Sequence, residues 1–243
     1  MKGRTVILIL LVFFSVLILS FPMRGLISIL DDQNSIKTQS IEGFWWKSNL
    51  QEVVIGNRQL GDIYINFLPS SLVQGKFEFY TEVSGKEIDL KGYIGTTFLG
   101  NVFFREIHFY ANPIIQIQSG KPVFQNISNI RADVPYLYFN KDGCLRAKGK
   151  GTGEIVDMFG LFSRNLNINI AMKCRAELLE LSFESLPQGL LEGEVLIDNN
   201  LEFKLEARSK RLSSKIREIS KLNFEKDPSL KVSGNLEDLL NNF

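Results

Sequence analysis

The fold is decided by two stretches, Gly61-Asp-Ile-Tyr-Ile-Asn-Phe67 and Gly75-Lys-Phe-Glu-Phe-Tyr-Thr-Glu-Val83, in which apolar and polar side chains alternate. Successive side chains of a β-strand point to opposite faces of the sheet, so this period of two predicts strands with one buried and one wet face. Burial of only one face is typical of antiparallel sheets. The residues expected on the buried face are Ile63, Ile65, Phe67, Phe77, Phe79, Thr81 and Val83.

The same alternation recurs on both sides of these stretches. Residues 87–91 and 166–170 alternate, and Asp198-Asn-Asn200 separates two further apolar runs, as in a tight hairpin. The spacing predicts roughly ten strands of an all-β domain. Other expected turns or loops are Leu68–Ser71, Val83–Lys86, Lys141–Gly143 and Lys148–Gly153.

Helical periodicity is scarce after the N-terminal region. Arg211–Leu222 has apolar residues at helical spacing, Leu236–Leu240 predicts a final turn, and Phe159–Phe162 fits either a helical turn or a loop. These few helices cannot cover the apolar face of a large sheet. The sheet is therefore expected to fold over itself. We therefore predict a mainly β, antiparallel, strongly curved or sandwich-like domain with a short C-terminal helix.

An uncharged segment, residues 5–23, precedes this domain. A helix of that length covers roughly the 30 Å hydrocarbon core of a bilayer. Lys2 and Arg4 precede it, which by the positive-inside rule places the N-terminus in the cytoplasm and the main domain across the membrane. The expected organisation is cytoplasmic residues 1–4, an anchor helix 5–23, a linker 24–40 and an extracytoplasmic β-domain 41–243.

A cleaved signal peptide is the alternative interpretation of the N-terminal segment. Bulky residues occupy most positions of Ile18-Leu19-Ser20-Phe21-Pro22-Met23, where a signal peptidase requires small side chains. We therefore favour a retained anchor.

The two cysteines, Cys144 and Cys174, are too few for a zinc site. In an oxidising compartment they are expected to form one disulfide, and two buried thiols are the alternative. The predicted extracytoplasmic location favours the disulfide.

Catalytic and nucleotide-binding signals are weak. The one histidine, His108, lies in a strand-like segment and fits an exposed strand position. Lys148–Gly153 lacks the spacing of a phosphate-binding loop and is expected to be a hairpin loop. With 28 basic and 27 acidic residues, the charge balance gives no reason to expect nucleic acid. We predict no enzyme activity, cofactor or metal.

Aromatic residues are abundant: the chain has 19 Phe, and Trp45 and Trp46 are adjacent. An ordinary hydrophobic core explains such residues. Alternatively, they form an apolar groove for an acyl chain or a partner strand. The residues predicted for such a groove are Trp45, Trp46, Phe77 and Phe79.

The order of several motifs resembles the type II secretion system protein N family. After the N-terminal segment come Ile41-Glu-Gly-Phe-Trp-Trp46 and Leu68-Pro-Ser-Ser-Leu-Val-Gln-Gly75. Gly143-Cys144-Leu-Arg-Ala-Lys-Gly149 and a second cysteine, Cys174, follow. The resemblance extends over most of the chain, although Phe44-Trp45-Trp46 replaces the more usual Trp-x-Gly.

The resemblance implies an inner-membrane protein with a periplasmic β-domain that assists assembly of a type II secretion system through contacts with its other components. It supplies no catalytic residues. The alternative is a lipid-binding or lipid-transfer protein similar to AsmA-like proteins. A closed core would favour the first interpretation, and an open apolar trough floored by Phe77 and Phe79 would favour the second.

Overall fold

The computed structural model describes most of the chain from Pro22 onward. The described residues are 7, 12, 13, 15–17, 19–30, 36–55, 58–112, 127–155, 166–186, 190–208 and 229–235. The predicted anchor lies only partly within these ranges, and the predicted helices at 211–222 and 236–240 and the segment 159–162 lie outside them. No helix in the described ranges is both long and apolar enough to cross a membrane.

The described strands form one fourteen-stranded antiparallel sheet, which confirms the mainly β, antiparallel prediction. From β3 to β14 every strand pairs with its neighbours in sequence, and β1 and β2 both pair with β3. The elements are α2 (Met23–Leu30), β1 (Ile36–Lys37), β2 (Ser40–Phe44), β3 (Lys47–Ile55), β4 (Arg58–Phe67), the 3-10 helix η1 (Pro69–Gln74), β5 (Lys76–Ser84), β6 (Ile88–Thr97), β7 (Val102–Ala111), β8 (Ile127–Asn140), β9 (Gly143–Ile155), β10 (Leu166–Arg175), β11 (Leu178–Leu186), β12 (Glu192–Ile197), β13 (Glu202–Arg208) and β14 (Ser229–Asn235).

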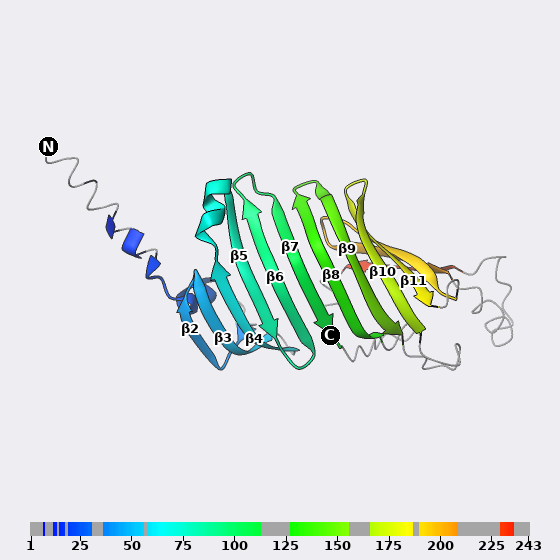
Figure 1. Cartoon of the computed structure of the whole chain (residues 1–243), viewed down its shortest axis with the longest axis horizontal. Helices are drawn as coiled ribbons and strands as arrows, with labels where there is room; N and C mark the ends of the chain where they lie inside the picture. The colour runs from blue at the N-terminus through cyan, green and yellow to red at the C-terminus, as the bar shows by residue number, and fades with distance from the viewer. Residues whose placement is uncertain are drawn as a thin grey trace.

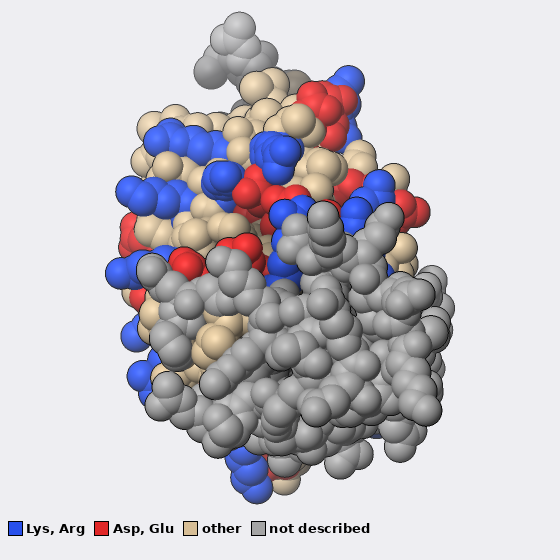
Figure 2. Space-filling view, turned by 90° about the vertical axis from the view of Figure 1, so that its right-hand side faces the viewer, with Lys and Arg blue, Asp and Glu red and all other residues tan. Residues whose placement is uncertain are grey.

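The sheet is strongly curved. Strands β2–β11 follow one another across the molecule, and the yellow to red strands β12–β14 turn back behind the last of them (Figure 1). Seen from the right-hand side of Figure 1, Lys and Arg lie interspersed with Asp and Glu over the described surface (Figure 2). The outside of the curve is therefore polar at this end of the sheet.

The strand register separates an apolar face from a polar face. Residues opposite each other on paired strands share a face, so the partners Phe67 and Phe79 lie on the same side, as do Phe79 and Ile94. We call this side the apolar face; its members include Ile63, Ile65, Phe67, Phe77, Phe79, Val83, Leu90, Ile94, Phe104, Phe109, Leu137, Ile170 and Phe183. The alternation predicted for β4 and β5 is confirmed.

Buried hydrophobic side chains are spread along the sheet, from Leu50 and Val53 on β3 to Ala207 on β13. A cluster of them lies where the sheet turns back and comprises Leu166, Ile168, Leu191 and Ala207, with Ile170, Phe183 and Leu190 packed against it. Across β4–β6 most of the apolar face is only half-buried, and the side chain of Phe77 is 42% exposed. The wide part of the sheet therefore keeps accessible apolar surface.

The segment Lys148–Gly153 was wrongly predicted as a loop, because it lies within β9. Its glycines serve packing on the apolar face. A Cβ on Gly149 would lie 3.2 Å from Val134 and 3.3 Å from Met172, whose side chains occupy that space. Glycine thus marks crowding by neighbouring strands here, rather than a turn.

The shorter turns are as predicted. In the hairpin between β12 and β13, the carboxylate of Asp198 accepts hydrogen bonds from the backbone N–H groups of Asn200 and Glu202, both at 2.9 Å. Leu68 precedes η1, and Pro69–Ser71 form the first half of this 3-10 helix. Within the predicted linker 24–40, most of α2 and the short strand β1 are ordered elements.

Candidate functional site

An aromatic cluster occupies one end of the apolar face. The rings of Phe67 and Phe79, on neighbouring strands, lie 5.2 Å apart, and Trp45 packs 5.5 Å from Phe67. Phe77 extends the cluster to Phe98, with ring centroids 5.3 Å apart. Three of the four predicted groove residues, Trp45, Phe77 and Phe79, are therefore in one cluster.

Trp46, the fourth predicted residue, is not part of this cluster. Its ring stacks on Phe44 at 5.9 Å, and its Nε1–H donates a hydrogen bond to the backbone carbonyl of Leu19 at 2.9 Å. The two adjacent tryptophans therefore have different roles, because one packs on the sheet and the other holds the N-terminal segment. Phe67 and Phe98 belong to the cluster although sequence analysis did not assign them to the groove.

The N-terminal segment meets the sheet at the aromatic cluster. Pro22 forms a β-bridge with Phe44, and the backbone N–H of Trp45 donates to the carbonyl of Phe21 at 3.3 Å. An apolar pocket of about 360 Å³ lies between this segment and the sheet, lined by Leu17, Phe21, Leu26 and Trp45. Apolar surface is thus continuous from the N-terminal residues to the cluster.

The apolar face continues from the cluster across the sheet in rows of cross-strand partners. One row runs from Phe79 through Ile94 and Phe104 to Leu137, on β5–β8. A parallel row, nearer the other end of the strands, contains Ile63, Val83, Leu90, Phe109 and Ala132. Neither row contains a charged side chain, so together they form a broad apolar strip.

The polar face carries paired charges instead. Arg105 contacts the largely buried carboxylate of Glu78 at 3.0 Å, and its guanidinium lies 4.7 Å from the ring centre of Tyr93. His108 is exposed, as predicted, and its Nδ1 lies 2.7 Å from Asp133. The side chains of His108 and Asp133 border a shallow groove of about 390 Å³ on this face.

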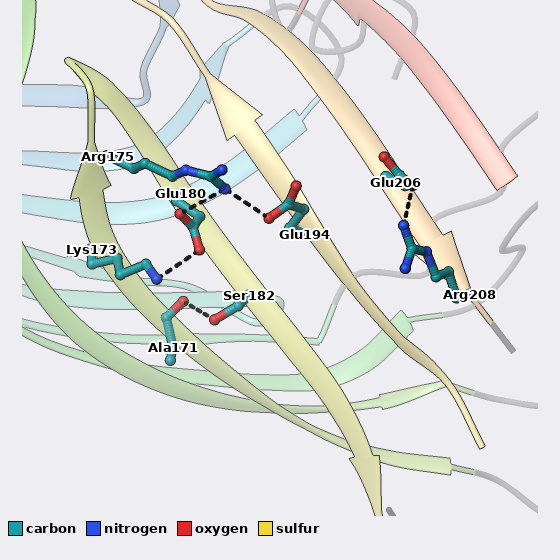
Figure 3. Close-up of polar contacts among 8 residues, drawn as sticks. All are labelled: Ala171, Lys173, Arg175, Glu180, Ser182, Glu194, Glu206 and Arg208. Carbon is teal, nitrogen blue, oxygen red and sulfur yellow. Dashed lines mark hydrogen bonds and ion pairs between the residues drawn. The ribbon is translucent and has the colours of Figure 1, made fainter. Parts of the chain in front are cut away.

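A second set of charges crosses β10–β12. Glu180 lies 3.0 Å from Lys173 and 3.7 Å from Arg175, which also reaches Glu194 at 3.4 Å (Figure 3). Because these side chains point toward one another, their charges are mutually compensated. This arrangement fits a structural network of ion pairs better than a site for a charged ligand.

One carboxyl group and one phenol hydroxyl on the polar face have shifted pKa values. The hydrogen bond from Arg208 to Glu206, at 2.9 Å, and the nearby Lys231 lower the pKa of the Glu206 carboxyl. Burial and the carboxylate of Glu82 raise the pKa of the Tyr80 hydroxyl. Neither group contacts the apolar face, and the described residues contain no group of three or more side chains suited to hold a metal ion.

Cys144 and Cys174 form a disulfide, as predicted, with a Cα–Cα distance of 5.6 Å. It joins the start of β9 to the end of β10, and the backbone N–H of Cys144 also donates to the carbonyl of Glu177 at 2.7 Å. The bond therefore secures the sheet just before the strands turn back.

In comparisons with known proteins, no family model, curated protein or solved structure matches the chain.

Proposed function

We propose that the protein binds the acyl chains of lipids on the apolar face of its curved sheet, next to the membrane that holds its N-terminal segment. The observation that carries this proposal is the half-buried apolar strip that begins at Trp45 and the N-terminal residues and crosses β4–β8. An acyl chain has no hydrogen-bonding groups, so an uncharged apolar strip is the surface it requires. At about 0.8 kcal/mol per buried methylene, ten methylenes would gain about 8 kcal/mol before the cost of ordering the chain.

The proposed location rests on the uncharged N-terminal segment, the basic residues Lys2 and Arg4 before it, and the family resemblance. The N-terminal segment lies in the inner membrane with its start in the cytoplasm, and the sheet lies in the periplasm, where the disulfide is stable. Lipid would enter at the aromatic cluster, because this part of the apolar face adjoins the N-terminal residues. The paired charges of the polar face keep the other side of the sheet in water.

A second candidate function is the one implied by the resemblance to the type II secretion system protein N family. In that case the protein is an accessory component that assists assembly of the secretion system. The edge strand β14 favours this candidate, since no described strand pairs with its outer side. An exposed edge permits strand addition by a partner protein.

The first experiment is native mass spectrometry of the full chain purified from membranes, followed by organic extraction. Bound phospholipid is expected in the native protein. Replacing Phe77 and Phe79 together by Asn should reduce it severalfold, because both polar amides would face the acyl chain.

The matched control replaces Tyr64 and Tyr80 by Asn, because Tyr80 lies on β5 with Phe77 and Phe79, Tyr64 lies on the neighbouring β4, and both tyrosines are on the polar face. Lipid should be retained in this control. Phe77→Asn alone serves if the double variant unfolds, because Phe77 is already partly exposed. A lipid-free native protein, or equal loss from both double variants, would contradict lipid binding at this face and leave the secretion-component candidate.

A further inference from the structure

Two loop tips expose large apolar side chains to solvent. In η1, Val73 is 92% exposed beside the exposed Leu72, and in the turn between β6 and β7, Leu99 is 89% exposed beside the exposed Phe98. Neither Leu68–Gly75 nor Gly95–Val102 contains a charged residue. Exposed bulky apolar side chains on uncharged, neighbouring loops are typical of a surface that contacts another apolar phase.

The two tips are held together in fixed positions. The backbone N–H of Phe98 donates to the carbonyl of Gly75 at 2.9 Å, and the ring of Phe98 packs against Phe77. The hydroxyl of Ser71 shares its one hydrogen between the carbonyl oxygens of Leu68 and Lys76, at 2.7 and 3.0 Å. These bonds hold the backbone of the two tips, and the side chains of Val73 and Leu99 project from it into solvent.

The tips lie at the end of the sheet where the N-terminal segment attaches. Because the strands are antiparallel, the turn Trp45–Trp46, the end of β4 and the turn between β6 and β7 share one end, and the backbone N–H of Phe67 donates to the carbonyl of Trp46. In Figure 1, η1 stands at the upper edge of the sheet, and the described residues of the N-terminal segment, drawn in blue, lie to the left of the sheet.

We propose that these tips, Leu72–Val73 and Phe98–Leu99, insert into the interfacial region of the lipid bilayer that holds the N-terminal segment. The bilayer is favoured as the occupant because the tips share one end with an exposed apolar segment that includes Val16, Leu17 and Leu19. The adjacent Trp45 and Trp46 are residues enriched at membrane interfaces. Insertion would orient the sheet on the membrane, whether or not its apolar face carries lipid.

The test uses the full chain with a single added cysteine, Val73→Cys or Leu99→Cys, labelled with a polarity-sensitive fluorophore. The native cysteines are paired in a disulfide, so the added thiol is the reactive one. The matched control is Leu186→Cys, an exposed leucine at the opposite end of the strands. Each protein is reconstituted into phosphatidylcholine–phosphatidylglycerol vesicles with and without nitroxide-labelled lipid.

Insertion predicts a blue-shifted emission and severalfold stronger nitroxide quenching at positions 73 and 99 than at position 186. Emission and quenching equal at all three positions would overturn the inference and indicate a protein partner for the tips. Circular dichroism of each labelled protein confirms folding. The measured quantities are the emission and quenching of a fluorophore on the tip, not the amount of extracted lipid. The result is therefore independent of the lipid-binding proposal.

Discussion

Glu180 shows what burial of a charge requires at the scale of a single residue. Its side chain lies on the polar face but is only 5% exposed, and it keeps its charge compensated by Lys173 and Arg175. A buried carboxylate that loses a partner is left with an uncompensated desolvation cost. We therefore expect an ion pair of this face to contribute more to the free energy of unfolding when its carboxylate is buried than when both side chains are exposed.

Lys173→Met should lower the free energy of unfolding by about 1–3 kcal/mol, because it removes the nearer partner of Glu180. The control is Lys204→Met, an exposed lysine on the same face, which should change stability by less than about 0.5 kcal/mol. Urea denaturation measures both. Equal losses of stability in the two variants would show that the ion pair of Lys173 with Glu180 contributes no more than an exposed lysine.

The Glu206 carboxyl predicts a pH dependence of known sign. Its pKa is lowered in the folded state, so its interaction with Arg208 stabilises the fold above the pKa of the unfolded carboxyl. That contribution is lost as the pH falls through the lowered, folded-state pKa. In Arg208→Gln, an NMR titration should show the pKa of Glu206 returning toward its ordinary value, whereas an unchanged pKa would exclude Arg208 as the cause.

The disulfide predicts a larger effect on stability. It spans 30 residues, a loop whose closure restricts the unfolded chain by about 3–4 kcal/mol. Replacing Cys144 and Cys174 by Ser should lower the free energy of unfolding by that amount. The native protein under reducing conditions should unfold at the same urea concentration as the double variant, and a difference would indicate that the serines add an effect of their own.

At the scale of elements, glycines decide how closely strands pack on the apolar face. A Cβ on Gly193 of β12 would lie 2.5 Å from the ring of Phe183 and 2.4 Å from the carbonyl oxygen of Glu206. Gly193→Val should therefore destabilise the fold by about 1–3 kcal/mol. Glu192→Val, one residue away on the polar face, should have less than half this effect in thermal unfolding, and equal effects would argue against crowding at Gly193.

The same scale shows where sequence reasoning succeeds. The strands β4 and β5 alternate regularly because one face is apolar and the other wet, so their faces could be predicted residue by residue. The glycines of β9 obscured a strand, because glycine leaves no side chain whose polarity reports a face. Phe103 lies on the polar face but is only 1% exposed, which the local pattern does not predict. Its ring is covered by the side chains of Tyr138 and Lys76, which come from other strands.

The candidate site was predictable to the same extent. Phe77 and Phe79 were assigned from alternation within one strand, a local signal. Phe98 joins them only through the packing of a turn against β5, and Trp46 leaves them to bind the N-terminal segment. Such contacts depend on how separate segments meet in space, which the local pattern does not encode.

At the scale of the whole molecule, pairing of neighbours in sequence produces one wide, curved sheet whose two faces differ in polarity. A cluster of buried residues lies where the sheet turns back, and an apolar strip with many half-buried side chains begins at the end that meets the N-terminal segment. The lipid site that we propose therefore adjoins the N-terminal segment, and the clustered core lies away from it.

Photocrosslinking in cells tests the central claim, that lipid binds the apolar face, most directly. A p-benzoylphenylalanine is placed at Phe79 or at Tyr80, consecutive aromatic positions of β5 that lie on the apolar and the polar face, respectively. After irradiation, mass spectrometry should find phospholipid adducts at position 79 and not at position 80. Adducts at neither position, or equally at both, would contradict lipid binding on the apolar face.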